Sequence, residues 1–67
     1  MKLLDEFDVR DRMKLRLQVG EYEGLERVDI RQYIKVDNEF ISTKKGINFS
    51  SEWIDKFFSI VDKLKEI

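Results

Sequence analysis

Polar side chains, most of them basic, recur at every second residue in two stretches of the chain. In the first stretch the cations are Arg10, Arg12, Lys14 and Arg16, and the alternate positions hold Met13, Leu15, Leu17 and Val19. The second stretch places Arg27, Asp29, Arg31, Tyr33 and Lys35 on one parity and Val28, Ile30, Ile34 and Val36 on the other, with only Gln32 interrupting. Successive side chains of a β-strand point to opposite faces. Two adjacent antiparallel strands of this kind would carry a basic stripe on one surface and cover a hydrophobic core with the other.

Cations combined with aromatic rings are the chemistry of a surface that binds single-stranded nucleic acid. Such a surface needs cations along the backbone path and aromatic faces that accept any base, with stacking contributing roughly 1–3 kcal/mol per base. The basic stripe, Tyr22 and the pair Lys44-Lys45 supply both parts. Simpler interpretations stay open: Tyr22 could shield a turn, the lysines could be solvated turn charges, and Arg31 could pair with Asp29 in a surface salt bridge.

Composition narrows the classes of function. The chain has 67 residues, with 13 basic and 14 acidic side chains and a net charge of −1. The net charge alone argues against a polyanion as binding partner, and only the arrangement of the charges favours one. It has neither cysteine nor histidine, which leaves carboxylates as the only plausible metal ligands, and it has no Gly-rich phosphate loop. Because its turns build no evident carboxylate cluster, we expect no cofactor, no metal site and no enzymatic activity. The absence of cysteine fits an intracellular protein of the cytoplasm or nucleoid, or of the host cytoplasm for a virus. No apolar run approaches the roughly 20 residues that cross a bilayer, so no membrane partner is expected.

Turn signals divide the chain into a predicted four-stranded antiparallel sheet. Residues 20–24, Gly-Glu-Tyr-Glu-Gly, predict a connection between strands, and residues 36–39, Val-Asp-Asn-Glu, predict a second turn. A short strand is expected from about Glu39 to Thr43, followed by a corner at Lys44-Lys45-Gly46 and a brief fourth strand over residues 47–49. Residues 1–9 fit either a short helical turn or an extension of the first strand.

A C-terminal amphipathic helix is predicted from Ser51 to about Glu66, where the apolar period changes to three and four residues. Ser50 is the expected N-cap, and Glu52 lies favourably in the first turn. The apolar face comprises Trp53, Ile54, Phe57, Phe58, Val61 and Leu64, with Ile60 and Ile67 beside it. This face is broader than one small sheet needs, and a lone chain of this length buries little surface. We therefore expect a homodimer with Trp53, Phe57 and Val61 at its interface.

The run VDIRQYIKVDNEFISTKKGINFSSEW, preceded by VGEYEG, resembles the positive cofactor four family of transcriptional coactivators. Its pattern is an aromatic beside a glycine, then Asp-Ile-Arg-x-Tyr, a turn, a basic-Lys-Gly-Ile corner and an acidic-Trp helix start. The likeness covers residues 13–65. It implies a single α+β domain over residues 1–67, in which a curved four-stranded antiparallel sheet is followed by one C-terminal helix and two chains form a homodimer. Without the long serine-rich and lysine-rich leader of eukaryotic members, the chain resembles a compact bacterial, archaeal or viral version.

The resemblance also implies binding of single-stranded or melted DNA without strong sequence preference. It assigns Tyr22 to the family's stacking aromatic, Arg31 to the arginine of the Asp-Ile-Arg motif, and Lys44 and Lys45 to the basic pair before the glycine. The further DNA-binding candidates are the stripe cations Arg10, Arg12, Lys14, Arg16 and Arg27. The chain departs from the family pattern in three places. Ile34 stands where the family has a tryptophan, and Glu23 and Leu25 stand where the family often has basic residues around the first turn. The turn at residues 36–39 is one residue shorter.

The sequence thus predicts a homodimer that binds single-stranded DNA in transcription, replication or recombination, with proteins of those processes as further partners. The alternative is a dimeric interaction module that recruits a polymerase or recombination factor and binds little DNA itself. Phe40 is left open, either as a core residue or as a replacement for the aromatic lost at Ile34. Tyr33 is expected to be a structural cross-strand aromatic.

Overall fold

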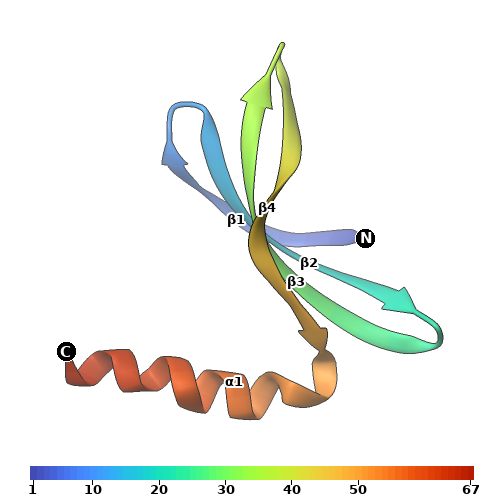
Figure 1. Ribbon diagram of the computed structural model, residues 1–67, viewed down its shortest axis with the longest axis vertical. Helices are drawn as coiled ribbons and strands as arrows, with labels where there is room; N and C mark the ends of the chain where they lie inside the picture. The colour runs from blue at the N-terminus through green and yellow to red at the C-terminus, as the bar shows by residue number, and fades with distance from the viewer.

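The computed structural model describes all 67 residues as one antiparallel sheet followed by a helical segment (Figure 1). The strands are β1 (Lys2–Arg10), β2 (Met13–Tyr22), β3 (Leu25–Val36) and β4 (Glu39–Ser50), adjacent in chain order. The helical segment comprises the 3-10 helix η1 (Ser51–Trp53), the α-helix α1 (Ile54–Val61) and the 3-10 helix η2 (Asp62–Glu66). The predicted α+β fold, a four-stranded antiparallel sheet followed by one C-terminal helix, is confirmed.

The boundaries of the four strands differ from those predicted from the sequence. Residues 2–10 form a strand of their own, β1, which pairs with β2 from Lys2↔Val19 to Arg10↔Met13. At the other edge, β4 pairs with β3 along its whole length, from Glu39↔Val36 to Ser50↔Arg27. The predicted corner at residues 44–46 is therefore wrong: these residues lie within β4, where the register shifts opposite the segment between Arg31 and Tyr33. A bulge of this kind bends a strand without ending it.

Two tight hairpins set the register of the central strands. Glu23 and Gly24 have φ values of 52° and 79°, and Asp37 and Asn38 have values of 50° and 72°. Positive φ at both loop residues defines the type I′ turn, whose twist matches that of the strands. The predicted turn at residues 36–39 is confirmed. The first connection is shorter than predicted, because Gly20 and Tyr22 lie within β2 and only Glu23 and Gly24 form the loop.

The sheet is strongly curved and open. Figure 1 shows the β1–β2 and β3–β4 hairpins extending from one end of the sheet and the β2–β3 hairpin from the other. The helical segment continues from the end of β4 and runs away from the strands. No helix is long and apolar enough to cross a membrane.

The apolar core within one chain is very small. Val28 and Phe49 are the only buried hydrophobic residues, 6% and 5% exposed. The helix is attached to the sheet chiefly through aromatic contacts, because the rings of Phe57 and Trp53 stack on Phe49 at centroid distances of 4.9 and 6.4 Å. Much of the apolar face of the sheet and helix therefore stays open to solvent.

The helical segment begins where the sequence predicts. The Ser50 hydroxyl accepts a hydrogen bond from the Glu52 amide at 3.3 Å, so Ser50 caps the segment as expected. Only Ile54–Val61 is α-helical, however, and the predicted single helix from Ser51 to Glu66 has 3-10 geometry in both end portions. Such tightening is common where helices begin and end.

Candidate nucleic-acid interface

The polar parities of β2 and β3 share one face of the sheet, as predicted. The register places Lys14 opposite Tyr33, Arg16 opposite Arg31, Gln18 opposite Asp29 and Gly20 opposite Arg27. Directly opposed residues of antiparallel strands lie on the same side. We call this surface the polar face.

The basic stripe is shorter than the sequence indicates. Arg10 ends β1 and Arg12 lies in the β1–β2 turn, so β2 carries two cations of the stripe, Lys14 and Arg16, and not four. A guanidinium nitrogen of Arg12, Nη2, donates to the Lys35 carbonyl at 3.1 Å, and the Lys35 amide donates to the Arg12 carbonyl at 2.9 Å. The turn therefore lies against the end of β3, with Arg12 beside Lys35, whereas Arg10 pairs with Met13 of the apolar parity.

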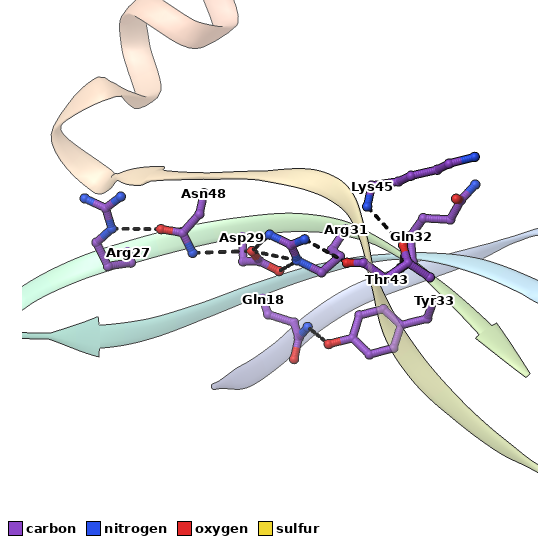
Figure 2. A network of polar contacts seen from close by, with 9 residues as sticks. All are labelled: Gln18, Arg27, Asp29, Arg31, Gln32, Tyr33, Thr43, Lys45 and Asn48. Carbon is purple, nitrogen blue, oxygen red and sulfur yellow. Dashed lines mark hydrogen bonds and ion pairs between the residues drawn. The ribbon is translucent and has the colours of Figure 1, made fainter. Parts of the chain in front are cut away.

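A buried carboxylate organises the centre of the polar face (Figure 2). Asp29 is 4% exposed and accepts hydrogen bonds from Nε and Nη2 of Arg31 at 3.0–3.2 Å and from the Asn48 amide at 3.3 Å. Asn48 in turn accepts from Arg27 Nε at 2.9 Å. The hydrogen bonds to Asp29 raise the pKa of Arg31 above its ordinary value, so this guanidinium stays charged. The network holds Arg27 and Arg31 in fixed positions along β3.

Arg31 also fastens the bulge that carries the lysine pair (Figure 2). Its Nη1 donates to the Thr43 carbonyl at 2.8 Å. The Thr43 hydroxyl donates to the Gln32 carbonyl at 2.8 Å and accepts from the Lys45 amide at 3.1 Å. The backbone at Lys44 and Lys45 is therefore held by three hydrogen bonds around Thr43. Both lysines are exposed to solvent.

Gly46 completes the bulge because no larger residue fits there. A Cβ at this position would lie 2.7 Å from the Ile30 carbonyl oxygen and 2.9 Å from Arg31 Cα. These are backbone atoms of the neighbouring strand and cannot move aside easily. The sequence Lys-Lys-Gly therefore brings two exposed ammonium groups to a point where β4 presses against β3.

The cations of β2 are paired with a carboxylate of β1. Lys14 Nζ lies 3.1 Å from Glu6 Oε2, and Arg16 Nε lies 2.8 Å from Glu6 Oε1. These hydrogen bonds, from Lys14 first and then Arg16, lower the pKa of Glu6 below its ordinary value. The Arg16 guanidinium carbon also lies 4.6 Å from the centre of the Tyr33 ring, whose hydroxyl accepts from Gln18 Nε2 at 2.6 Å.

Phe40 belongs to the polar face and not to the core. Three cations surround its ring, with Lys14 Nζ 5.0 Å, Arg16 Cζ 5.7 Å and Lys35 Nζ 6.0 Å from the ring centre. Cations over an aromatic ring are attracted by its quadrupole. The half-buried Phe40 ring therefore packs against the β2 cations Lys14 and Arg16.

Tyr22 lies at the far end of the polar surface, at the tip of the β2–β3 hairpin. It is 68% exposed and pairs with Leu25 across the turn. An open hollow of about 620 Å³ adjoins it, lined by Met1, Gly20, Glu21, Tyr22, Glu23, Leu25, Arg27 and Asn48. An exposed ring beside a hollow of this size can stack against a planar ligand such as a nucleobase.

The structure brings six of the nine predicted DNA-binding residues into two groups, whereas Tyr22 lies apart at the tip of the β2–β3 hairpin and Arg10 and Arg12 lie at the β1–β2 turn. Arg27, Arg31, Lys44 and Lys45 lie along β3 and β4, linked through Asp29 and Thr43, whereas Lys14 and Arg16 lie on β2 beside Glu6. No group of three or more Asp, Glu, His or Cys side chains is arranged to hold a metal ion.

The three residues predicted at a dimer interface differ in their environment. Phe57 packs on Phe49 and is half-buried, whereas Trp53 is 60% exposed and Val61 is also exposed. Phe58, Ile60 and Leu64 extend the same uncovered apolar surface of the helical segment.

Sequence reasoning missed Glu6 and the amides Gln18 and Asn48. A signal for Glu6 was present, because residues 6, 8 and 10 are charged and alternate with Phe7 and Val9. This alternation fails at Leu3-Leu4, where the register of β1 shifts between Leu3 and Asp5. The irregularity hid a strand that neutralises part of the basic stripe.

Solved structures of two proteins share this fold. A PC4 homologue from Burkholderia pseudomallei matches with a TM-score of 0.86 and 20% identity, covering 96% of each chain. Its orthorhombic crystal form gives a TM-score of 0.85. A bacteriophage T5 homologue of the eukaryotic coactivator PC4, described as implicated in recombination-dependent DNA replication, matches with a TM-score of 0.64 and 22% identity, covering 92% of this chain and 77% of that one. A comparison with curated protein sequences finds no match.

The fold is that of a small sheet-and-helix protein, and the family model defines its class as DNA-binding and coactivator-like. The sequence profile of transcriptional coactivator p15 (PC4) matches residues 9–60, most of the chain. The chain belongs to this family, which confirms the resemblance seen in the sequence. The family is one of non-enzymatic, DNA-binding transcriptional coactivators, and its T5 homologue is the one described as implicated in recombination-dependent DNA replication.

Proposed function

We propose that the chain binds single-stranded DNA without strong sequence preference, through the polar face and as a homodimer. The observation that carries this proposal is the combination of an exposed ring, Tyr22, with exposed cations on a rigid backbone. Lys44 and Lys45 take part in none of the ion pairs of the structure, so both charges are available to phosphates. Stacking and phosphate contacts are the two interactions that a nonspecific single-strand binder combines.

The homodimer is supported by the uncovered apolar surface. Large apolar side chains on both the sheet and the helical segment are exposed, and a hollow of about 150 Å³ between them is lined only by apolar residues: Leu4, Leu17, Val19, Val28, Phe49, Ile54, Phe57 and Phe58. Apolar area of this extent is typical of a surface that a partner covers. We propose a second copy of the chain as that partner, with Trp53, Phe57 and Val61 in the interface and residues 1–67 acting as one domain.

The test uses a fluorescently labelled single strand at low salt, with an unlabelled duplex of the same length as competitor. A flexible single strand can place its bases on Tyr22, whereas a duplex hides them, so single strands should compete much better than duplex. Equal competition by both would reduce the surface to a general cationic patch. Light scattering in the same buffer should give about twice the chain mass.

A second function, recruitment of a polymerase or recombination factor, is favoured by the same exposed apolar residues of the helical segment. It predicts a dimer that fails to retain the labelled strand even at low salt. The oligonucleotide experiment therefore separates the two functions directly.

A further inference from the structure

The Glu6 carboxylate binds the two cations of β2 in the way that a phosphate would. Each of its oxygens accepts from a different cation, Oε1 from Arg16 at 2.8 Å and Oε2 from Lys14 at 3.1 Å. Asp8 adds a longer contact to Lys14 at 3.7 Å. The two donors are therefore already spaced and aimed at one bridging anion.

Aromatic rings fix these donors in place. Arg16 lies over Tyr33, and Lys14 lies over Phe40. The rings contact the cations without consuming their hydrogen-bond donors. Removal of the carboxylate would leave Lys14 and Arg16 held over the rings with donors free for another anion.

The second carboxylate–arginine pair of the polar face is different in kind. Asp29 is almost fully buried, and it binds Asn48 as well as Arg31. Glu6 lies on the edge strand β1, and its side chain is 30% exposed. Ion pairs accessible to water are weak, so an incoming phosphate can compete with Glu6 but not with Asp29.

We propose that Lys14 and Arg16 form a phosphodiester-binding subsite that Glu6 occupies in the free protein, and that a bound single strand displaces the Glu6 carboxylate. This inference rests on the proposed single-strand binding and adds to it a competitor built into the chain. Glu6 thereby weakens binding and makes it depend more on stacking than on charge.

The experiment measures the affinity of a labelled oligothymidylate for the wild-type protein and for Glu6→Gln over a range of salt concentrations. Glu6→Gln should tighten binding roughly three- to tenfold at low salt, since two partly exposed ion pairs no longer compete with the phosphates. The plot of log affinity against log salt should steepen by about 0.7 for each additional phosphate that the protein neutralises, up to about 1.4 for both cations.

Two further variants distinguish the loss of the Glu6 ion pairs with Lys14 and Arg16 from a change in the overall charge of the protein. Glu39→Gln removes one carboxylate near Phe40 in sequence, but Glu39 is in none of the ion pairs of the structure, so binding should change less than about twofold. Glu6→Asp keeps the charge but is one methylene too short to reach both cations, so it should tighten binding as Glu6→Gln does. Circular dichroism checks folding, and Glu6→Asp decides the matter if Glu6→Gln does not fold.

Equal effects of Glu6→Gln and Glu39→Gln on a wild-type protein that binds the oligonucleotide would overturn the subsite while leaving the proposed function intact. Weaker binding by Glu6→Gln would also overturn it, because Glu6 would then position the cations for DNA. Failure of both wild-type protein and Glu6 variants to bind would reject the proposed function and this inference together.

Discussion

On the polar face no buried side-chain nitrogen or oxygen lacks a hydrogen-bond partner, whereas on the opposite face only Val28 and Phe49 are buried. Asp29 and Gln18 have their partners within one chain, so the polar face is organised before any ligand arrives. The apolar face has too few neighbours to form a core. The comparison indicates that one chain suffices to organise the polar face but buries very little apolar surface to stabilise it. Five experiments test this division, beginning with the largest expected effect.

Phe57→Asp should abolish the folded protein. Phe57 joins the helix to Phe49, and in the proposed dimer it also lies at the interface, so a charge there removes both contacts at once. In a small obligate dimer, unfolding and dissociation occur together. Light scattering and circular dichroism should show loss of dimer and of structure. Ser59→Asp, an exposed position of the same helix, is the matched control and should leave both unchanged. A folded Phe57→Asp monomer would show that the apolar face is not needed.

Asp29→Ala should be the most damaging change on the polar face. It leaves Arg31 without its carboxylate partner in a partly buried position, and breaking a pair in this way lowers the free energy of unfolding by about 3 kcal/mol. Urea denaturation at one fixed protein concentration measures the effect. Asp29→Asn keeps an acceptor for Arg31 and should lose less. Equal stability of Asp29→Ala and wild type would mean that the network does not organise this face.

Tyr22→Ala should weaken oligonucleotide binding without affecting stability. Tyr22 is exposed at a hairpin tip, so its loss should remove about 1–3 kcal/mol of binding free energy per stacked base. The salt dependence should stay nearly constant, because stacking releases no counterions. Tyr22→Phe retains the ring and should bind almost as wild type. If Tyr22→Ala binds normally, the strand is held by its backbone alone.

Replacing Lys44 and Lys45 with Ala should give the opposite signature. Single-strand binding should weaken, and the plot of log affinity against log salt should flatten by roughly 0.7 for each phosphate that is no longer neutralised. The double change Lys56→Ala and Lys63→Ala removes the same charge from the helical segment and should leave the slope nearly unchanged. An unchanged slope for the bulge variant would place the DNA path elsewhere.

The sequence predicted the polar face better than the edges of the sheet. Period-two alternation identified β2 and β3, and the Asp-Asn pair identified one hairpin, because both are local properties of the chain. The path of β4 was mispredicted because Lys-Lys-Gly is typical of a turn. What keeps β4 extended there is non-local: Thr43 and Arg31 secure the bulge, and Gly46 permits close contact with β3. The pairing of Glu6 with Lys14 and Arg16 was missed for the same reason, since it requires the register of β1.

The smallest expected effect is the pH dependence of stability that Glu6 contributes. Its pKa in the folded protein is lowered from the ordinary value of 4.5 by the hydrogen bonds from Lys14 and Arg16. A carboxylate with a lowered folded pKa stabilises the protein above its unfolded pKa, and this contribution is lost as pH falls through the folded value. Wild type should therefore be slightly more stable than Glu6→Gln at pH 7, and the difference should vanish in acid below the folded pKa. An NMR titration of the Glu6 carboxyl group should give a pKa below 4.5, and saturating the protein with oligothymidylate should perturb this resonance. A titration at the ordinary value would show that Glu6 does not hold Lys14 and Arg16 in solution. The proposed difference between these two cations, paired with Glu6, and the unpaired Lys44 and Lys45 would then disappear.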